Sequence, residues 1–456
     1  MDTQAAARAV AGRMIGRSVV FARVTTDTRA LRDGDLFVAL KGENFDGHDF
    51  VPAALAKGAA AAMIDAARQP AGDGNYVAVA DPLQALGRLA AHWRQRFTLP
   101  LAVVVGSNGK TTVKEMLASI LRAEFGGGAV LATQGNLNNA IGLPLTLLRL
   151  RSAHRAAVIE LGMNHRDETR DLAFIALPTI VLINNAQREH QEFMTSVADV
   201  AAEHADAIAA LPRDGTAIIN ADDMFAPMWT AAAQAVGARV ITFALDHSAE
   251  VGGRGTLRDG GSDITITLPS GPVDVALEAP GAHMMRNALA AAAAALASGA
   301  SPKAIREGLA AFRPAPGRLV ALRAASGARV FDDSYNANPD SMRAAIDVLA
   351  AAPGTRVLVI GDMGEVGTAG PAFHREIGVY ARACGIDRLL ATGEMAREAV
   401  AAFGGNAEHF SDIHDLVSRA RAAAGVDVSV LVKGSRFMRM ERVVAALTGA
   451  AVAGAH

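Results

Sequence analysis

Residues 101–117 read LAVVVGSNGKTTVKEML, an apolar run that ends in a glycine-rich turn and a lysine. Its five leading apolar residues predict a buried strand, and the helical pattern that begins near Lys110 predicts a helix directly after it. Gly106 and Gly109 leave the backbone N–H groups of the turn free to face an anion. The positive end of the helix points at the same place. The order of strand, glycine-rich turn, lysine and helix therefore predicts a phosphate-binding loop.

This loop departs from the general pattern G-x-x-x-x-G-K-[ST], because Val104 stands where that pattern has its first glycine. We expect the amine of Lys110 to pair with outer phosphates and the hydroxyl of Thr111 to face a magnesium ion. A strand-to-helix turn with a surface lysine is the alternative, which the complete order of elements disfavours. The predicted nucleotide contacts of the loop are Gly106, Ser107, Asn108, Gly109, Lys110, Thr111 and Thr112.

The composition limits the classes of protein to which the chain can belong. With 456 residues it is too long for one ordinary core, so two to three domains are expected. The net charge of −2 gives no support for broad binding to nucleic acid or to an anionic membrane. Cys384 is the only cysteine, which excludes a disulfide within the chain and a cysteine-based zinc site. A reducing cytoplasm fits this cysteine usage.

Neither a signal peptide nor a membrane span is expected. The first residues, MDTQAAARAVAGRMIG, lack the charged-then-apolar order of a signal peptide. The longest apolar run, NALAAAAAALASGA at 287–300, is mostly alanine and is short for a membrane span. That run therefore predicts a buried helix.

Three segments follow one another along the chain, and we expect domains at 1–98, 99–313 and 314–456. The second segment holds the apolar runs AAVIELG, TIVLINNA, TAIINADD and RVITFAL, as expected of parallel strands buried on both faces. Its stretch ITITLPSGPVDVAL predicts an antiparallel hairpin. FRPAPGR at 312–318 predicts a linker, and after it strands such as RVLVIGDMG alternate with helices.

The predicted fold is therefore an α/β protein of three domains. The central domain has a parallel sheet like that of P-loop ATPases, and the C-terminal domain is Rossmann-like.

The form GSNGKTT, together with TQGNLNNAIGLPLTLL, IELGMNHRDE, GAHMMRN, APGR and FDDSYNANPDSM, resembles the Mur ligases over nearly the whole chain. The resemblance implies an ATP-dependent cytoplasmic enzyme of peptidoglycan precursor synthesis. The stretch FDDSYNANPDSM, with GDMGEVG after it, implies the branch that joins D-Ala-D-Ala to UDP-MurNAc-tripeptide through an acyl phosphate. ATP and Mg²⁺ are the implied cofactors. The implied partners are these small molecules, with no nucleic acid and no membrane insertion, and the chain is expected to be a monomer.

The same resemblance implies a magnesium site formed by Thr111, Glu160 and His190, with Glu192 carried over beside it. Glu160 follows a predicted strand, and the carboxyl ends of parallel strands form the ligand edge of a sheet. Alone, a glutamate at a strand end is more often a surface residue, and a loop histidine is more often solvated.

His204 marks a departure from the family. A lysine, modified to a carbamate that helps to hold a second magnesium ion, stands near this point in most Mur ligases. Here no lysine occurs between Lys114 and Lys303. Magnesium prefers hard oxygen ligands, so histidine is a poor direct substitute. Our hypothesis is that His204 positions a magnesium-bound water or a phosphate, and the alternative is a helix-surface histidine with no role.

The resemblance to the family also assigns further residues to the binding of the substrates. The implied nucleotide contacts outside the loop are Asn287, one turn after His283, with Arg318 and Asp333. Asn136, Asn138 and Asn139 are expected at the sugar or peptide, with turn formation as the alternative. Asn336 and Asn338 are expected at the incoming dipeptide, with helix capping competing at Asn338. Thr28, Arg29, Asp46 and His48 are expected at the UDP end, where arginine suits a diphosphate.

Two other kinds of function stay open at this point. The first is a related ligase, either one that adds the third residue of the peptide or a folylpolyglutamate synthase relative. The second is a nucleotide-binding regulatory protein that has lost catalysis, which the missing lysine keeps in consideration. Turnover that depends on the substrates would separate the enzyme from the binding protein.

Overall fold

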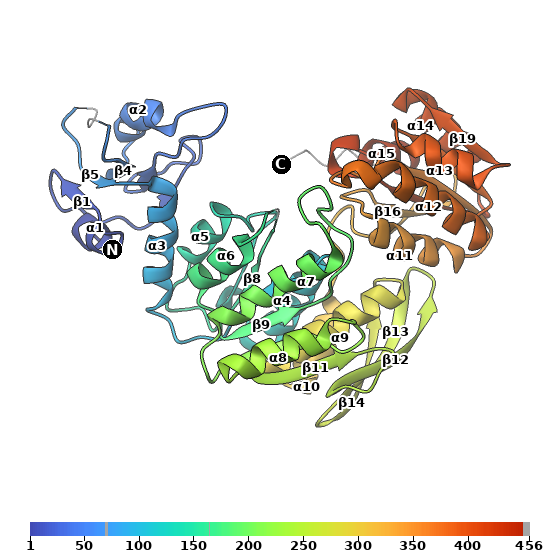
Figure 1. Cartoon of the computed structure of the whole chain (residues 1–456), viewed down its shortest axis with the longest axis horizontal. Helices are drawn as coiled ribbons and strands as arrows, with labels where there is room; N and C mark the ends of the chain where they lie inside the picture. The colour runs from blue at the N-terminus through green and yellow to red at the C-terminus, as the bar shows by residue number, and fades with distance from the viewer. Residues whose placement is uncertain (69–71, 164, 450–456) are drawn as a thin grey trace.

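The computed structural model describes residues 1–68, 72–163 and 165–449 of the chain, and these form three sheets in sequence order. Figure 1 shows the sheets and their helices arranged in an arc, with the central part between the first and the third. The expected α/β architecture of three domains is confirmed. No helix in the described part of the chain is both long and apolar enough to cross a membrane.

The first sheet has the order β1-β5-β4-β3-β2, in which β1 is antiparallel to β5 and the other pairs are parallel. Three α-helices accompany it, and α3 continues into the central part (Figure 1). The bounds are α1 Thr3–Ala9, β1 Arg13–Ile15, β2 Val24–Thr25, β3 Leu36–Val38, α2 Val51–Ala56, β4 Ala61–Asp65, β5 Tyr76–Val79 and α3 Pro82–Arg94.

The central sheet has the order β14-β13-β12-β11-β10-β9-β6-β8-β7. It is parallel from β7 to β12, and the pairs β12–β13 and β13–β14 are antiparallel, so the predicted hairpin is confirmed. The strands are β6 Leu101–Val105, β7 Val130–Ala132, β8 Ala156–Glu160, β9 Ile180–Ile183, β10 Thr216–Asn220, β11 Arg239–Ala244, β12 Val251–Arg258, β13 Gly261–Leu268 and β14 Gly271–Leu277. The helices are α4 Lys110–Phe125, α5 Gly142–Leu147, α6 Glu168–Ala176, α7 Val197–Asp206, α8 Ala226–Val236, α9 Ala282–Ala297 and α10 Pro302–Ala311.

Both faces of this central sheet are buried, as its apolar strands predict. Successive residues of a strand point to opposite faces, so Val103 and Val104 of β6 enter different cores. The core on the side of Val104 contains α4, α9 and α10, and that on the side of Val103 contains α3 and α5 to α8. These helices hold the carboxyl ends of β6, β8 and β9 at one edge, where the phosphate loop lies.

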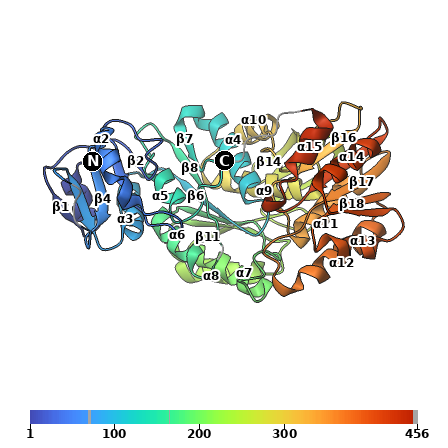
Figure 2. The ribbon, with the colours of Figure 1, turned by 90° about the horizontal axis from the view of Figure 1, so that it is seen from above.

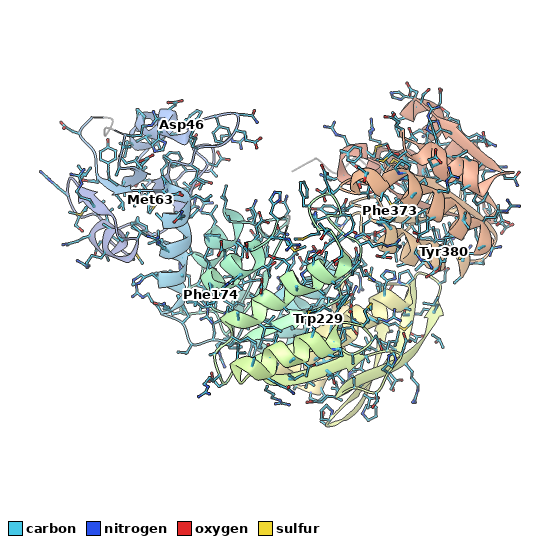
Figure 3. The ribbon with its side chains drawn as sticks, viewed as in Figure 1. Asp46, Met63, Phe174, Trp229, Phe373 and Tyr380 are labelled. Carbon is cyan, nitrogen blue, oxygen red and sulfur yellow. The ribbon has the colours of Figure 1, made fainter. Side chains whose placement is uncertain are left out.

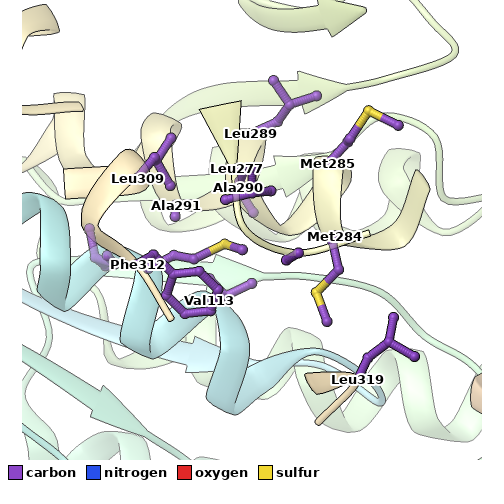
Figure 4. Packing of buried hydrophobic residues seen from close by; sticks show 14 of the residues in the cluster. Val113, Leu277, Met284, Met285, Leu289, Ala290, Ala291, Leu309, Phe312 and Leu319 are labelled. Carbon is purple, nitrogen blue, oxygen red and sulfur yellow. The ribbon is translucent and has the colours of Figure 1, made fainter. Parts of the chain in front are cut away.

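The alanine-rich run forms α9, and Ala290 to Ala295 are inaccessible to solvent. Figure 4 shows Ala290 and Ala291 near Val113 of α4 and Leu309 of α10. The neighbouring helices α10 and α4 also approach closely, because a Cβ at Gly308 would lie 2.3 Å from the Cα of Ile120. Small side chains therefore let this layer pack tightly beneath the phosphate loop.

The third sheet has the order β15-β16-β20-β17-β18-β19, parallel except for β15 against β16. Figure 2 shows it at the end of the molecule opposite to the first sheet. The bounds are β15 Val320–Arg323, β16 Arg329–Asp333, α11 Pro339–Ala350, β17 Thr355–Ile360, α12 Gly370–Ala383, β18 Arg388–Thr392, α13 Ala396–Phe403, β19 Ala407–Phe410, α14 Ile413–Ala423, β20 Val428–Lys433 and α15 Glu441–Thr448. The predicted linker connects α10 to β15.

Candidate active site

The phosphate loop lies between β6 and α4, with Gly106 at a φ of 139° and Gly109 at 82°. Gly109 is the N-cap of α4. A Cβ at that position would lie 2.5 Å from Oδ1 of Asn287 and 2.7 Å from Nδ2 of Asn184, so a side chain is excluded by contact as well as by conformation. The N-terminus of α4 is therefore open to an anion.

Lys110 folds back over this loop. Its Nζ donates to the carbonyl of Gly106 and, at 3.4 Å, to that of Ser107. It also lies 3.3 Å from Oε2 of Glu189. Backbone carbonyls and a carboxylate thus accept the hydrogen bonds of the amine. In a nucleotide complex, phosphate oxygens would take the place of these acceptors.

A cavity of about 1130 Å³ opens above the loop, lined by residues of the central and third parts of the chain and by Leu83, Gln84 and Gly87 of α3. It takes in every site residue predicted from these two parts of the chain except Gly106, Glu192 and His204. Glu192 does not line the cavity and is exposed. The structure therefore brings the predicted nucleotide, metal and dipeptide residues to one place.

Glu160, at the carboxyl end of β8, has one oxygen available in this cavity. The residue is 3% exposed, and its Oε1 accepts a hydrogen bond of 2.9 Å from Nδ2 of Asn138. Its Oε2 is buried and has no hydrogen-bond partner among the described residues. A buried carboxylate oxygen without a partner is costly unless a cation satisfies it. This observation fits magnesium, and Thr111 also lines the cavity.

His190 contacts a residue of the third part of the chain. Its backbone has a φ of 48°, and Nδ1 lies 2.8 Å from Oε2 of Glu365. This contact with His190 is the main cause that lowers the pKa of Glu365. In the described part of the chain, no three His, Cys, Asp or Glu side chains alone form a group that could hold a metal. Magnesium bound here would therefore need phosphate oxygens and water as ligands in addition to the protein side chains.

Glu189 is a site residue that the sequence analysis missed. Its side chain is 7% exposed, and its Oε2 faces Lys110. Burial raises the pKa of this carboxyl, but Lys110 and His204 outweigh that effect and lower it to about 2. The only signal in the sequence is an acidic residue directly before the predicted His190, which alone indicates nothing about burial.

His204 is 1% exposed, so the alternative of a helix-surface histidine is wrong. It does not line the cavity either. Its Nε2 lies 3.3 Å from Oε1 of Glu189, which stands between this histidine and Lys110. His204 therefore lies against the carboxylate that faces the loop and not at the cavity wall, and the hypothesis that it positions a phosphate or a magnesium-bound water stays a prediction.

The asparagines after β7 divide between the cavity and local structure. Asn138 orients Glu160, as described above, whereas Asn139 Oδ1 accepts from the N–H groups of Ile141 and Gly142 at the start of α5. Asn136 is exposed at the cavity wall. Turn formation therefore accounts for the visible contacts of Asn139.

The linker, α9 and the third sheet supply the opposite wall. Arg318 stacks over the ring of Tyr335 at 4.2 Å, and Asn287 Oδ1 accepts a 2.9 Å hydrogen bond from Asn184. Asp333 Oδ2 lies 2.6 Å from Nζ of Lys433, a buried lysine that the sequence analysis missed.

His283 also lies in this wall, and burial lowers its pKa to about 4. Its ring is therefore neutral near neutral pH.

Asn338 caps α11, because its side chain accepts from Ser341 N–H and the Ser341 hydroxyl accepts from Asn338 N–H. The competing interpretation as a helix cap is thus confirmed. Its Nδ2 also donates to Oδ1 of Asn108 at 2.9 Å, so the cap touches the phosphate loop. Asn336 accepts a hydrogen bond from Lys433 through its carbonyl oxygen.

A second contact joins the central and third parts, and the sequence analysis missed it too. Arg188 donates to both oxygens of Asp340 and to Glu376, and its guanidinium lies 5.3 Å from the ring centre of Phe373. These acidic groups raise the pKa of Arg188. We name Arg188, Asp340 and Glu376 the Arg188 bridge.

The four residues predicted at the UDP end lie outside the cavity. Arg29 is paired with Asp27, and its side chain is 89% exposed. Asp46 contacts His48 and Arg68, while His48 Nε2 accepts from the N–H of Asp65 at the end of β4. Thr28 accepts from Lys57 through its carbonyl. Figure 3 places Asp46 in the first part, far across the molecule from Phe373.

Three family models match successive parts of the chain. They are the Mur ligase family catalytic domain at 20–94, the Mur ligase middle domain at 104–295 and the Mur ligase glutamate ligase domain at 317–436. Each lies in one of the three parts described above.

Individual relatives match the chain over nearly its whole length. The UDP-N-acetylmuramoyl-tripeptide–D-alanyl-D-alanine ligase of Escherichia coli K12 is 42% identical, with 96% of each chain covered. A crystal structure of MurF from Acinetobacter baumannii is 33% identical, with a TM-score of 0.90 and 98% of each chain covered. MurF ligase from Thermotoga maritima in complex with ADP is 24% identical, with a TM-score of 0.82 and 93% of this chain and 96% of that one covered, and shows the same fold. The chain belongs to the Mur ligase family.

Proposed function

We propose that the protein is an ATP-dependent amide ligase that joins D-Ala-D-Ala to UDP-MurNAc-tripeptide in peptidoglycan precursor synthesis. The observation that carries the proposal is the convergence of Lys110, Thr111 and the unpartnered oxygen of Glu160 on one cavity with walls from two sheets. The full-length similarity to the Escherichia coli ligase supports this choice of substrates.

In the proposed reaction, the free carboxylate of the tripeptide attacks the γ-phosphorus of ATP, and ADP leaves. The amine of D-Ala-D-Ala then attacks the carbonyl carbon of the acyl phosphate, loses a proton, and phosphate leaves. Lys110 and the N-terminus of α4 stabilise the negative charge of the phosphoryl group in transfer. Mg²⁺ supplies further charge neutralisation, and Thr111, Glu160 and His190 are the residues that would hold it.

The other predicted residues take the remaining parts of the substrates. We assign Asn287, Arg318 and Asp333 to the nucleotide, and Asn336 and Asn338 to the dipeptide. Asn136, Asn138 and Asn139 are assigned to the tripeptide, and Thr28, Arg29, Asp46 and His48 to the UDP end. The proposed domains are 1–98, 99–313 and 314–456, and each contains one of the three family models.

We also propose that the enzyme acts in the cytoplasm as a monomer. Its proposed substrates are nucleotide-linked or small water-soluble molecules. All the groups named for the reaction come from one copy of the chain.

Release of inorganic phosphate tests the proposal. The purified protein is incubated with ATP, Mg²⁺, UDP-MurNAc-tripeptide and D-Ala-D-Ala, and each component is omitted in turn. Sustained release that needs all four components is the expected result. A folded protein that releases no phosphate in any combination would instead support a binding protein that has lost catalysis.

Lys110→Ala gives a matched variant for this assay. Loss of a charged group that stabilises the transferring phosphoryl group is expected to lower kcat by about 100-fold or more. Lys303→Ala is the control, because Lys303 is exposed and only approaches Glu307 one helical turn away. Equal activities of the two variants would remove Lys110 from the mechanism.

A further inference from the structure

Glu189 is a buried carboxylate at the phosphate end of the cavity to which the proposed reaction has given no role. Its two oxygens face different basic groups: Oε2 lies 3.3 Å from Lys110, and Oε1 lies 3.3 Å from Nε2 of His204. Nε2 of His190 is 3.8 Å from Oε2. One negative charge therefore stands among three basic side chains, directly beside the place where a phosphate would meet Lys110.

A purely structural role explains this arrangement poorly. Removing a carboxylate from water is costly, and only good geometry with further hydrogen bonds recovers that cost. Here Oε1 has no hydrogen bond of good geometry among the described residues, and neither ring nitrogen of His204 has one. A buried, incompletely satisfied carboxylate in a cleft is typical of a functional position.

The neighbours of Glu189 show which groups its negative charge affects. His204 lies behind it in α7 and is outside the cavity, while Glu189 itself lines the cavity wall. Glu365 contacts His190, and at Asp223 burial raises the pKa while the charge of His204 offsets part of that rise. The charge of Glu189 therefore acts mainly on Lys110 and on a triphosphate that enters the cavity.

The proposed function, on which this inference rests, brings several negative phosphate oxygens to Lys110. Glu189 repels those oxygens and competes with them for the amine, unless a divalent cation lies between the two anions. We infer that Glu189, supported by His204, is a positioning residue that makes the binding of ATP depend on a divalent cation. Without the cation, Lys110 remains paired with the carboxylate of Glu189. With the cation bound, Lys110 can pair with the phosphates instead.

Calorimetric titration with a non-hydrolysable ATP analogue tests this inference on the full chain. Affinity is measured with and without MgCl₂ for the wild type, Glu189→Gln and Glu203→Gln. The quantity compared is the ratio of the two Kd values, which we name the magnesium increment. It does not depend on turnover, and a change in overall stability alone does not alter it.

Glu203→Gln is the matched control. Glu203 is also buried and is adjacent to His204 in α7, but its oxygens accept from the N–H groups of Asp167 and Thr169 and do not line the cavity. Its loss is expected to affect stability and to leave the magnesium increment at the wild-type value.

For Glu189→Gln, the analogue is expected to bind more tightly without magnesium, and the magnesium increment is expected to fall by about tenfold or more. That is the effect of one unit charge several ångströms from a phosphate at an effective dielectric constant of ~20. An increment equal to that of the wild type would overturn the inference. A wild-type protein that binds no analogue even with magnesium would instead overturn the proposed function.

A second variant covers the case in which Glu189→Gln does not fold. Glu189→Ala combined with His204→Leu removes both members of the contact, so neither is left buried without its partner. The same fall in the magnesium increment is expected, and a wild-type increment in this double variant would likewise overturn the inference.

Discussion

Single residues at the carboxyl ends of β6, β8 and β9 set the chemistry of the site. Lys110, Glu160 and Glu189 lie far apart in the sequence, yet parallel strands bring them to one sheet edge. Glycine at position 109 and asparagines at 184 and 287 then fit together so closely that no Cβ is tolerated at the turn.

The absence of a lysine between Lys114 and Lys303 leads to a prediction about bicarbonate. A carbamate forms only on a neutral amine that reacts with dissolved CO₂, and the central site has Glu189 and His204 where such a group is expected. Turnover is therefore expected to be the same, within about twofold, in degassed buffer and with added bicarbonate. The measurement is initial phosphate release at constant pH and ionic strength. A clear rise with bicarbonate would contradict this account.

Among single residues, the sequence was informative where the signal lay in one continuous stretch. The predicted order of strand, glycine-rich turn and helix is confirmed by β6 and α4, and the binding of phosphate by this turn stays a prediction. Glu189, Lys433 and Arg188 were missed, because a charged residue in a loop carries no mark of burial or of a distant partner. Their roles depend on contacts across 79, 100 and 152 positions of sequence.

At the scale of secondary-structure elements, the start of α11 has two functions that substitutions can separate. The Asn338 side chain caps the helix through its acceptor oxygen and reaches Asn108 through its Nδ2 donor. Aspartate would retain the acceptor but lose the donor, whereas alanine would lose both.

We therefore expect Asn338→Ala to lower the free energy of unfolding by about 1 kcal/mol. Asn338→Asp is expected to keep most of the stability, and both variants are expected to raise the KM for ATP. Thermal or denaturant unfolding and steady-state kinetics are the measurements. If Asn338→Asp has wild-type kinetics, the contact with Asn108 has no functional role.

The Arg188 bridge joins the loop after β9 to α11 and α12. Its charge-assisted hydrogen bonds are stronger than neutral ones, although Arg188 retains some exposure and solvent reduces their net effect. Arg188→Ala is expected to raise the KM for ATP by about tenfold, equivalent to about 1.4 kcal/mol. The control is Arg419→Ala, which breaks the pair with Glu408 away from the cavity. Similar kinetics for both variants would exclude a role for the bridge.

The bridge also predicts a dependence on pH. Hydrogen bonds from Arg188 are the main cause that lowers the pKa of Glu376 from its ordinary value of 4.5. The stabilisation is therefore complete above pH 4.5 and is lost as the pH falls through the lowered pKa. In Arg188→Ala this part of the acid sensitivity should disappear, which stability measurements between pH 3 and 6 would detect.

The elements themselves were largely predictable for the second and third parts of the chain. Strands buried on both faces read as unbroken apolar runs, and β8, β9, β10, β11 and β17 were recognised in this way. Short strands such as β1, β2 and β15 were not, since a few residues at a sheet edge carry too little pattern.

At the scale of the whole molecule, the first sheet stands apart from the chemistry. The central and third parts already meet at the Arg188 bridge and at Asn338, but Thr28, Arg29, Asp46 and His48 lie outside the cavity. If these four residues hold the UDP end of a substrate whose other end reaches Lys110, the first part must approach the cavity when that substrate binds.

Small-angle X-ray scattering tests this expected closure. The radius of gyration should decrease when UDP-MurNAc-tripeptide and an ATP analogue are added together, and less with the analogue alone, because the third part is already in contact with the phosphate loop. Identical profiles in all states would show that the molecule binds its substrates without such a movement.

The loop at 184–192 has a kinetic consequence. It donates and accepts hydrogen bonds at Asn108, carries Glu189 at Lys110, and holds α11 and α12 through Arg188. If the dipeptide binds at Asn336 and Asn338, as proposed, a nucleotide that arrives after it would have to pass residues that this loop keeps in place. The substrates are therefore expected to add in a compulsory sequence, with ATP first and D-Ala-D-Ala last, and the enzyme should hold the nucleotide as a kinetic trap until the amide has formed.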